Sequence, residues 1–297
     1  MLLPALAPFS RATFAQPAGP AGARTWRSFE VTSRIEVIDA QDMTRVWLPL
    51  PSVDAPGWMR DEAASWSGNS DSIEVIREPR YGARILFAQW QTANPTPALE
   101  VINRFSACDR HTDLSNPSQL QPLEPELRAL YTQATRLIPV DGIVRDTATT
   151  IVRGSRDDLA KARAIYEWVV QNTVRNPKTR GCGLGDIRFM LETGDLSGKC
   201  ADLNALYVGL CRSVGIPARD VYGLRVGDSR QGYKSLGRSG DVSKAQHCRA
   251  EVWLAQYGWV PVDPQTCAKS CSKKRPVRHW TIRWSGKCAA NCSAHGK

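Results

Sequence analysis

The first third of the chain alternates between apolar and polar positions. From Trp26 to about Arg110, short runs of period two are separated by clusters of proline, glycine, asparagine and aspartate. The alternating positions are Phe29, Val31, Ile35, Val37, Val46, Leu48, Ile73, Val75, Ile85, Phe87, Val101, Asn103 and Phe105. A period of two is that of a strand with one buried face. Residues 26–110 are therefore predicted to form a β-rich N-terminal domain, and the polar, proline-bearing residues 111–122 a linker.

Beyond the linker the apolar period becomes helical. One predicted helix carries Leu127, Leu130, Tyr131 and Ala134, and a second carries Leu159, Ala162, Ile165, Tyr166 and Val169. The second begins after Ser155, where Asp158 three residues on is close to a capping box. A third begins at Cys200, with apolar positions Leu203, Leu206, Tyr207, Leu210 and Val214, and ends at Gly215 and Pro217.

A β-hairpin is predicted near the end of this region. His247 precedes a strand-like run, residues 249–254, and a turn with Gly258 leads into a second run, residues 259–262, which ends at Asp263. Two strands joined by a short turn return on each other. His247 and Asp263 are therefore expected at the same end of the hairpin.

Cys200 is the candidate nucleophile, because it lies in the first turn of a predicted helix. The unpaired N–H groups and the positive dipole end at this position stabilise a thiolate and lower its pKa, and the same N–H groups can bind an oxyanion. A cysteine, a histidine and an aspartate in this arrangement are typical of a nucleophile, its general base and the group that orients the base.

Four ordered motifs carry a resemblance to a known family. They are Gly198-Lys199-Cys200-Ala201-Asp202, Gly215-Ile216-Pro217-Ala218-Arg219, His247 before Ala250-Glu251-Val252, and Tyr257-Gly258-Trp259-Val260-Pro261-Val262-Asp263-Pro264. Residues 123–264 closely resemble the transglutaminase-like superfamily of papain-fold thiol enzymes, in its bacterial exported branch. The resemblance implies an α+β fold, in which a helix bearing the cysteine packs on an antiparallel sheet bearing the histidine and aspartate.

The resemblance also implies the chemistry. Cys200 would be the nucleophile, His247 the general base and acid, and Asp263 the orienter of the imidazole in acyl transfer on peptide or amide bonds. Hydrolysis is favoured over transamidation because nothing in the sequence marks an amine site. The alternative is a catalytically inactive binding or assembly module of the bacterial envelope. No phosphate loop, dinucleotide motif or metal-ligand cluster is found upstream of residue 265, so we expect no cofactor.

The remaining cysteines leave several interpretations open. Cys182 could line a substrate cleft, form a disulfide with the nucleophile, or be only a loop cysteine, and we favour the last. Cys211 and Cys248 are predicted to pack in the core. The aromatic residues Trp253, Tyr257 and Trp259 are likewise predicted to pack rather than to stack on substrate. Asp202 and Asn204 follow Cys200, and a carboxylate such as Asp202 in a first helical turn is ordinary dipole compensation.

The positive charge of the chain is concentrated in its tail. Residues 265–297 carry eight Lys or Arg and no Asp or Glu, and subtracting these eight from the net charge of +10 leaves +2 for residues 1–264. The charge of residues 1–264 therefore gives no reason to expect a nucleic-acid partner. The peptide or protein substrate that we expect is what the family resemblance implies.

The tail itself has two interpretations. Its four cysteines, Cys267, Cys271, Cys288 and Cys292, have a spacing that superficially suggests a zinc module. We favour a reading-frame shift, because a shifted frame replaces every cysteine by Leu, Met or Val and yields a charge-balanced, helix-like sequence. Sequencing the gene around the Pro264 codon tests this hypothesis.

The first 25 residues are rich in alanine and proline, and small residues near Ala15 form a candidate cleavage point. They resemble the later part of an export signal, so residues 1–25 are predicted to be a leader and the protein periplasmic or secreted. No apolar run reaches the 18 or so residues that a membrane span needs.

Overall fold

The computed structural model describes residues 25–40, 42–53, 55, 57–91, 96–110, 112–118, 120–227 and 240–265. The predicted leader, apart from residue 25, and the predicted frame-shifted tail, apart from residue 265, lie outside these residues. The chain divides into two compact units, Met1–Arg110 and His111–Lys297. No helix among the described residues is long and apolar enough to cross a membrane.

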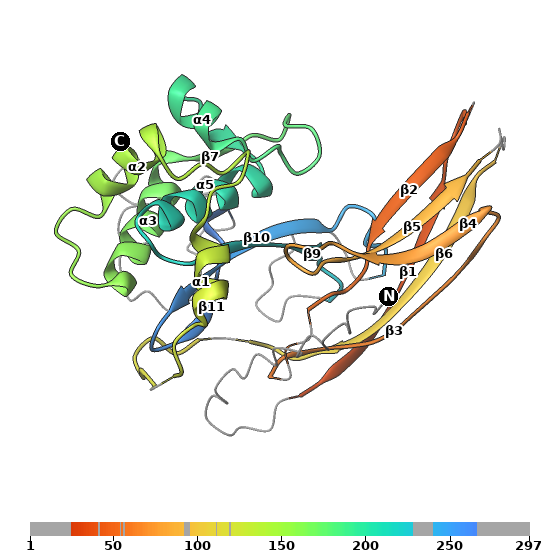
Figure 1. Cartoon of the computed structure of the whole chain (residues 1–297), viewed down its shortest axis with the longest axis horizontal. Coiled ribbons are helices and arrows are strands. Elements are labelled where there is room, and N and C mark those ends of the chain that lie inside the picture. The colour runs from red at the N-terminus through yellow and green to blue at the C-terminus, as the bar shows by residue number, and fades with distance from the viewer. Residues whose placement is uncertain are drawn as a thin grey trace, which may run out of the picture. The chain divides into compact units, whose positions relative to one another are not determined.

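The first unit contains only strands among its described residues. Their bounds are β1 Arg27–Glu36, β2 Thr44–Pro49, β3 Met59–Gly68, β4 Ser72–Arg77, β5 Arg84–Trp90 and β6 Ala98–Ala107. They form two antiparallel sheets of three strands, with the orders β1–β6–β3 and β2–β5–β4 (Figure 1). The strand β3 was not predicted, and it pairs with β6 through a bulge between Asp61 and Ala63.

The core of this unit consists of apolar residues from alternate strand positions. The buried members are Leu50, Leu86, Ala88, Trp90, Leu99 and Val101, which come mainly from β5 and β6. Because β5 and β6 belong to different sheets, this cluster joins the two sheets into one β-structure.

The second unit combines helices with a small antiparallel sheet. Its helices are α1 Pro125–Thr132, α2 Gly142–Ile151, α3 Asp158–Asn172, α4 Ile187–Thr193 and α5 Cys200–Ser213. Its strands are β7 Val174–Arg175, β8 Ser197–Gly198, β9 Ala218–Leu224, β10 Gln246–Leu254 and β11 Gly258–Val262. The sheet order is β11–β10–β9, and β7 pairs in parallel with β8. The predicted α+β class, with an all-β region before a helix-and-sheet core, is confirmed.

The helix α5 is buried on every side. It contacts β9 and β10 as well as α2, α3 and α4, and Figure 1 shows it in the middle of the helical layer. All 14 of its residues are buried, so it is a central helix rather than the amphipathic one that its apolar stripe suggests. A packed neighbour on each side fixes the direction of α5, and therefore the position of its first residue.

Two helical predictions need correction, and some elements were not predicted. The helix α1 ends at Thr132, so Ala134 lies beyond it. The helix α3 starts at Asp158 and is capped by Asp157, whose carboxylate accepts the N–H of Ala160 at 2.7 Å, rather than by Ser155. The helices α2 and α4, and the strand β9, were not predicted. Each is short and has too few apolar positions to establish a period.

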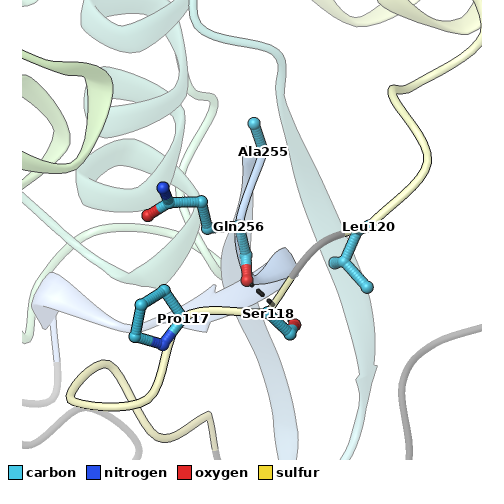
Figure 2. A pocket seen from close by; sticks show the side chains of 5 residues that line it. All are labelled: Pro117, Ser118, Leu120, Ala255 and Gln256. Atoms are coloured by element: carbon cyan, nitrogen blue, oxygen red, sulfur yellow. Dashed lines mark hydrogen bonds between the residues drawn. The ribbon is translucent and has the colours of Figure 1, made fainter.

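A surface hollow lies near the turn of the β10–β11 hairpin. Figure 2 shows its lining, Pro117, Ser118, Leu120, Ala255 and Gln256, in which the hydroxyl of Ser118 donates to the carbonyl of Gln256 at 3.1 Å. His247 is near the opposite end of β10, about 26 Å away at the usual rise of a strand. The hollow is therefore separate from the cysteine, histidine and aspartate considered next.

Candidate active site

Cys200 is the first residue of α5, as the sequence predicts. The parallel pair β7–β8 ends two residues before it, and this pairing anchors the chain where it enters the helix. The residue is 6% exposed. The thiol is thus held at a fixed helix N-terminus, where the dipole favours its ionised form.

His247 and Asp263 come together at the open end of the hairpin. His247 is the second residue of β10, and Asp263 directly follows β11. The ladder pairs Ala250 with Val262, which brings the two segments side by side. The imidazole Nε2 lies 2.7 Å from the carboxylate Oδ2 of Asp263, and both side chains are mostly buried. An imidazole held in this way has a fixed orientation, with its other ring nitrogen left for a further partner.

The pKa values of Cys200 and His247 shift in opposite directions. A hydrogen bond from the Cys248 thiol has the largest effect on the pKa of Cys200, which it lowers. Burial raises this pKa, but a hydrogen bond from His247 lowers it further, and the pKa falls to about 4. Burial alone would lower the pKa of His247, but the Asp263 carboxylate and the Cys200 thiolate outweigh it and raise that pKa to about 9. At neutral pH the pair is therefore thiolate and imidazolium.

Two further thiols lie against Cys200. The Sγ atoms of Cys182, Cys200 and Cys248 are all within 4.8 Å of one another. The pKa of Cys182 is raised mainly by burial and then by the negative charge of Cys200. The pKa of Cys248 is raised mainly by its hydrogen bond to Cys200 and then by burial. Both therefore stay protonated as thiols beside a thiolate.

This cluster changes three predictions from sequence. Cys248 is buried as predicted, but its thiol also donates to Cys200, so packing is only part of its role. Cys182 is more than a loop cysteine, because its Sγ belongs to the cluster and its carbonyl accepts the N–H of Ala201 at 2.9 Å. We also expected no metal-ligand cluster upstream of the tail, whereas these three thiols lie close enough together to hold a metal ion.

Asp202 positions the Cys182 loop, a role that dipole compensation alone does not describe. Its carboxylate is nearly buried and accepts two backbone N–H groups, from Lys199 and from Gly185, each at 2.9 Å. These bonds tie both the start of α5 and the glycine-rich loop to one side chain. The loop fits closely: a Cβ atom on Gly183 or on Gly198 would collide with Asp202.

Asn204 likewise holds two backbone segments together, on the side of the site where the sheet lies. Its side chain is fully buried, and its Nδ2 donates to the carbonyl of Cys200 at 2.8 Å and to that of Cys248 at 3.0 Å. One amide group therefore fixes the helix start against β10. The sequence signal for Asp202 and Asn204 was their spacing of two and four residues from Cys200, which places both in the first turns of the helix.

A glycine substitution tests this loop. Gly183 has φ +101° and faces Asp202, whereas Gly181 has φ +58° and no heavy atom within 4 Å of the point where a Cβ atom would lie. Both changes to alanine strain the backbone, but only Gly183→Ala displaces the carboxylate. We expect Gly183→Ala to lower the free energy of unfolding by about 1–3 kcal/mol more than Gly181→Ala, as measured by urea denaturation. Equal losses would show that Asp202 does not hold the loop.

The aromatic residues of the hairpin pack as predicted. Trp259 is 2% exposed and meets Tyr131 and Trp253 edge to face, at 4.9 Å and 5.7 Å between ring centroids. The guanidinium of Arg219 lies over the Trp259 ring and donates to the buried Glu251 carboxylate at 2.7 Å. These contacts hold β9, β10 and α1 together and leave Trp259 no surface for a substrate.

Comparison with known families and proteins places this geometry in context. The model of the transglutaminase-like superfamily matches residues 145–264, a range that includes all three predicted site residues. An uncharacterized protein of Haemophilus influenzae is 34% identical over 289 residues, which cover 87% of this chain and 78% of that protein.

One solved structure shows the same architecture, and a second is a more distant match. A candidate cysteine protease of Cytophaga hutchinsonii superposes with a TM-score of 0.62 and 15% identity, over 82% of this chain and 78% of that chain. The periplasmic domain of TgpA from Pseudomonas aeruginosa gives a TM-score of 0.44 and 17% identity, over 87% and 77% of the two chains. At such identities the first of these likenesses concerns the fold alone.

Proposed function

Because the chain belongs to the transglutaminase-like superfamily, we propose that it is a thiol enzyme that hydrolyses peptide or amide bonds through Cys200, His247 and Asp263. The observation that carries this proposal is the contact of Asp263 Oδ2 with the His247 imidazole at 2.7 Å. The lowered pKa of Cys200 and the raised pKa of His247 support it. A thiolate at neutral pH is a strong nucleophile without prior proton transfer.

In the first half of the reaction, the Cys200 thiolate attacks the substrate carbonyl carbon. The imidazolium of His247 then gives its proton to the departing amine, and the acyl group remains on sulfur as a thioester. The negative oxygen formed during attack needs backbone donors. The N–H of Ala201 is engaged by the Cys182 carbonyl, so we assign this role to the N–H of Cys200.

In the second half, neutral His247 removes a proton from water, which attacks the thioester and frees the acid and the thiolate. The Asp263 carboxylate holds the ring and stabilises the charge that returns to it. An amine in place of water would give transamidation. We favour water, because no residue described at the site offers a dedicated place for an amine.

Two exposed apolar side chains, one near Cys182 along the chain and one opposite Cys248 in the sheet, suggest what the substrate contains. Leu184 is 71% exposed and follows Cys182 by two residues, while Tyr222 is 64% exposed and pairs in register with Cys248. Exposed apolar residues at a reactive group are typical of a substrate-contact surface. We propose that these two residues contact an apolar side chain of a peptide substrate.

The location of the protein is part of the proposal. The alanine- and proline-rich leader resembles the later part of an export signal, and this likeness supports a periplasmic or secreted enzyme. Detection of the mature N-terminus in a periplasmic fraction tests it.

Alkylation of the thiols tests the nucleophile. In the folded protein, Cys200 is expected to react with iodoacetamide faster than Cys211, whose burial raises its pKa to about 12. The rate at Cys200 should change less than about threefold between pH 5 and pH 8, whereas an ordinary thiol slows roughly tenfold for each pH unit below 8. Mass spectrometry of the alkylated peptides measures both rates.

The same experiment in His247→Ala provides the contrast. Loss of the imidazolium should raise the pKa of Cys200 and restore a pH-dependent rate. A pH profile that is identical in the two proteins would contradict the ion pair, and equal rates at Cys200 and Cys211 would remove the support for catalysis. Screening casein and cell-wall peptides for new amino groups then identifies a substrate.

A further inference from the structure

The proposed reaction uses one of three thiols that meet at the site. Cys182 comes from the glycine-rich loop, Cys200 from the start of α5 and Cys248 from β10, and all three Sγ atoms lie within 4.8 Å of one another. Their backbones are held in place by Ala201, which donates to the Cys182 carbonyl, and by Asn204, which donates to the other two. A single nucleophile does not require this convergence.

The separation of the sulfur atoms is close to that of a metal site. Zinc binds thiolate at about 2.3 Å in a tetrahedron, which places its sulfur ligands about 3.8 Å apart. A pair at the observed limit of 4.8 Å would have to close by about 1 Å. Cys182 lies between Gly181 and Gly183, both at positive φ, and it is the only one of the three that lies outside a helix or strand.

His247, the neighbour of Cys200, offers a nitrogen as the fourth ligand, although its ring nitrogens lie outside the group of atoms within 4.8 Å of one another, so the ring has to move towards the ion. Its Nε2 is hydrogen-bonded to Asp263, so Nδ1 is the nitrogen that forms the hydrogen bond with Cys200. That nitrogen faces Cys200, one of the three thiols. A histidine whose second ring nitrogen is held by a carboxylate is the usual arrangement in zinc proteins, because the carboxylate fixes the ring and strengthens the ligand.

We propose that the three cysteines and His247 together bind one Zn²⁺ ion, which masks the Cys200 thiolate. Binding releases the two remaining thiol protons and the Nδ1 proton of the His247 imidazolium to solvent, and it forms three Zn–S bonds and one Zn–N bond. Four protein ligands leave no position for water or substrate, so the bound ion is inhibitory rather than catalytic. The binding is independent of the proposed enzymatic function, while the inhibition rests on it.

Zinc binding is measured on the reduced full-length chain, in which Cys267, Cys271, Cys288 and Cys292 are replaced by serine so that the tail holds no thiol. Titration against a chromophoric chelator should give one zinc per chain. Cys182→Ser and Cys248→Ser should each weaken binding by more than about 100-fold, and Asp263→Asn by about 10- to 100-fold. The matched control is Cys108→Ser, a buried cysteine of the other unit, which should bind as the parent does.

Cobalt substitution gives an independent readout. A Co²⁺-loaded parent should show intense tetrahedral bands and thiolate-to-cobalt charge transfer, which weaken in Cys182→Ser and are unchanged in Cys108→Ser. Bound zinc should also protect Cys200 from iodoacetamide. Failure to bind zinc, or equal affinity in the parent, Cys182→Ser and Cys248→Ser, would overturn the site.

The two proposals fail separately. One zinc per chain, lost in Cys182→Ser, supports the metal site even if no peptide or amide is ever cleaved. Conversely, a protein that hydrolyses its substrate and neither binds zinc nor slows when zinc is added supports the enzyme and rejects the metal site.

Discussion

Replacement of Cys200 by alanine is expected to lower the turnover rate by on the order of 10⁶-fold without unfolding the protein. The thiolate is the atom that forms the covalent bond, and neither remaining thiol of the cluster replaces it. Hydrogen bonding to Cys200 and burial keep Cys248 protonated by raising its pKa, and burial with the Cys200 charge does the same to the pKa of Cys182. Initial rates on the substrate found by screening measure the loss.

The matched control is Cys211→Ala, which removes a thiol from the same helix. Cys211 is fully buried in the core of the second unit, away from the three-thiol cluster. The change should cost stability, because it leaves a small cavity, but the remaining folded protein should turn over at the parental rate. Turnover of Cys200→Ala within about 100-fold of the parental rate would mean that another group is the nucleophile.

The elements that carry the predicted triad were accessible from sequence because each has a strong local signal. The helix α5 has apolar residues at helical spacing and a stop at Gly215, and the hairpin has two apolar runs around Gly258. The register itself came only with the structure, where Ala250 pairs with Val262. Local periodicity predicts elements, whereas register depends on the third strand, β9, and on packing against α5.

The missed elements lack that signal. The strand β3 reads MRDEAASWSG, in which charged and small residues occupy most positions, and its pairing partner β6 supplies the apolar contacts. The strand β9 mixes Arg219, Asp220 and Gly223 with apolar residues. Both strands exist because a neighbouring strand satisfies their backbone, and tertiary pairing of this kind leaves no period in the sequence.

The three-thiol cluster was missed for a related reason. Alternation correctly placed Cys248 on the buried face of β10, but that face is the one on which the start of α5 lies. Cys182 reaches the same point through a loop that is tied down by Asp202. Neither contact follows from spacing along the chain, because both depend on where α5 crosses the sheet.

Asp263→Asn should reduce turnover by about 10- to 1000-fold while leaving the fold intact. In serine triads the comparable change costs on the order of 10⁴-fold, because an amide can favour the wrong imidazole tautomer. A preformed thiolate–imidazolium pair depends less on its orienting group, so the loss should be smaller here. Asparagine keeps the size of Asp263, whose side chain is 18% exposed, and the melting temperature should therefore stay near that of the parent.

A pH profile separates an orienting role from a structural one. The Asp263 carboxylate helps to raise the pKa of His247 to about 9, although burial works against it. Without that charge the pKa of His247 should fall, so the alkaline limb of the turnover profile should move to lower pH. A purely structural loss would lower the whole profile without moving it.

The matched control is Asp241→Asn. Asp241 is exposed, and its carboxylate accepts the N–H of Ser243 at 2.9 Å, so it caps a local turn. Its replacement should leave both turnover and the pH profile unchanged. If Asp263→Asn instead turned over at the parental rate with an unmoved alkaline limb, Asp263 would not be the orienting residue. The partner that holds His247 would then have to be another carboxylate near the open end of the hairpin, and a loss in Asp241→Asn would point to Asp241.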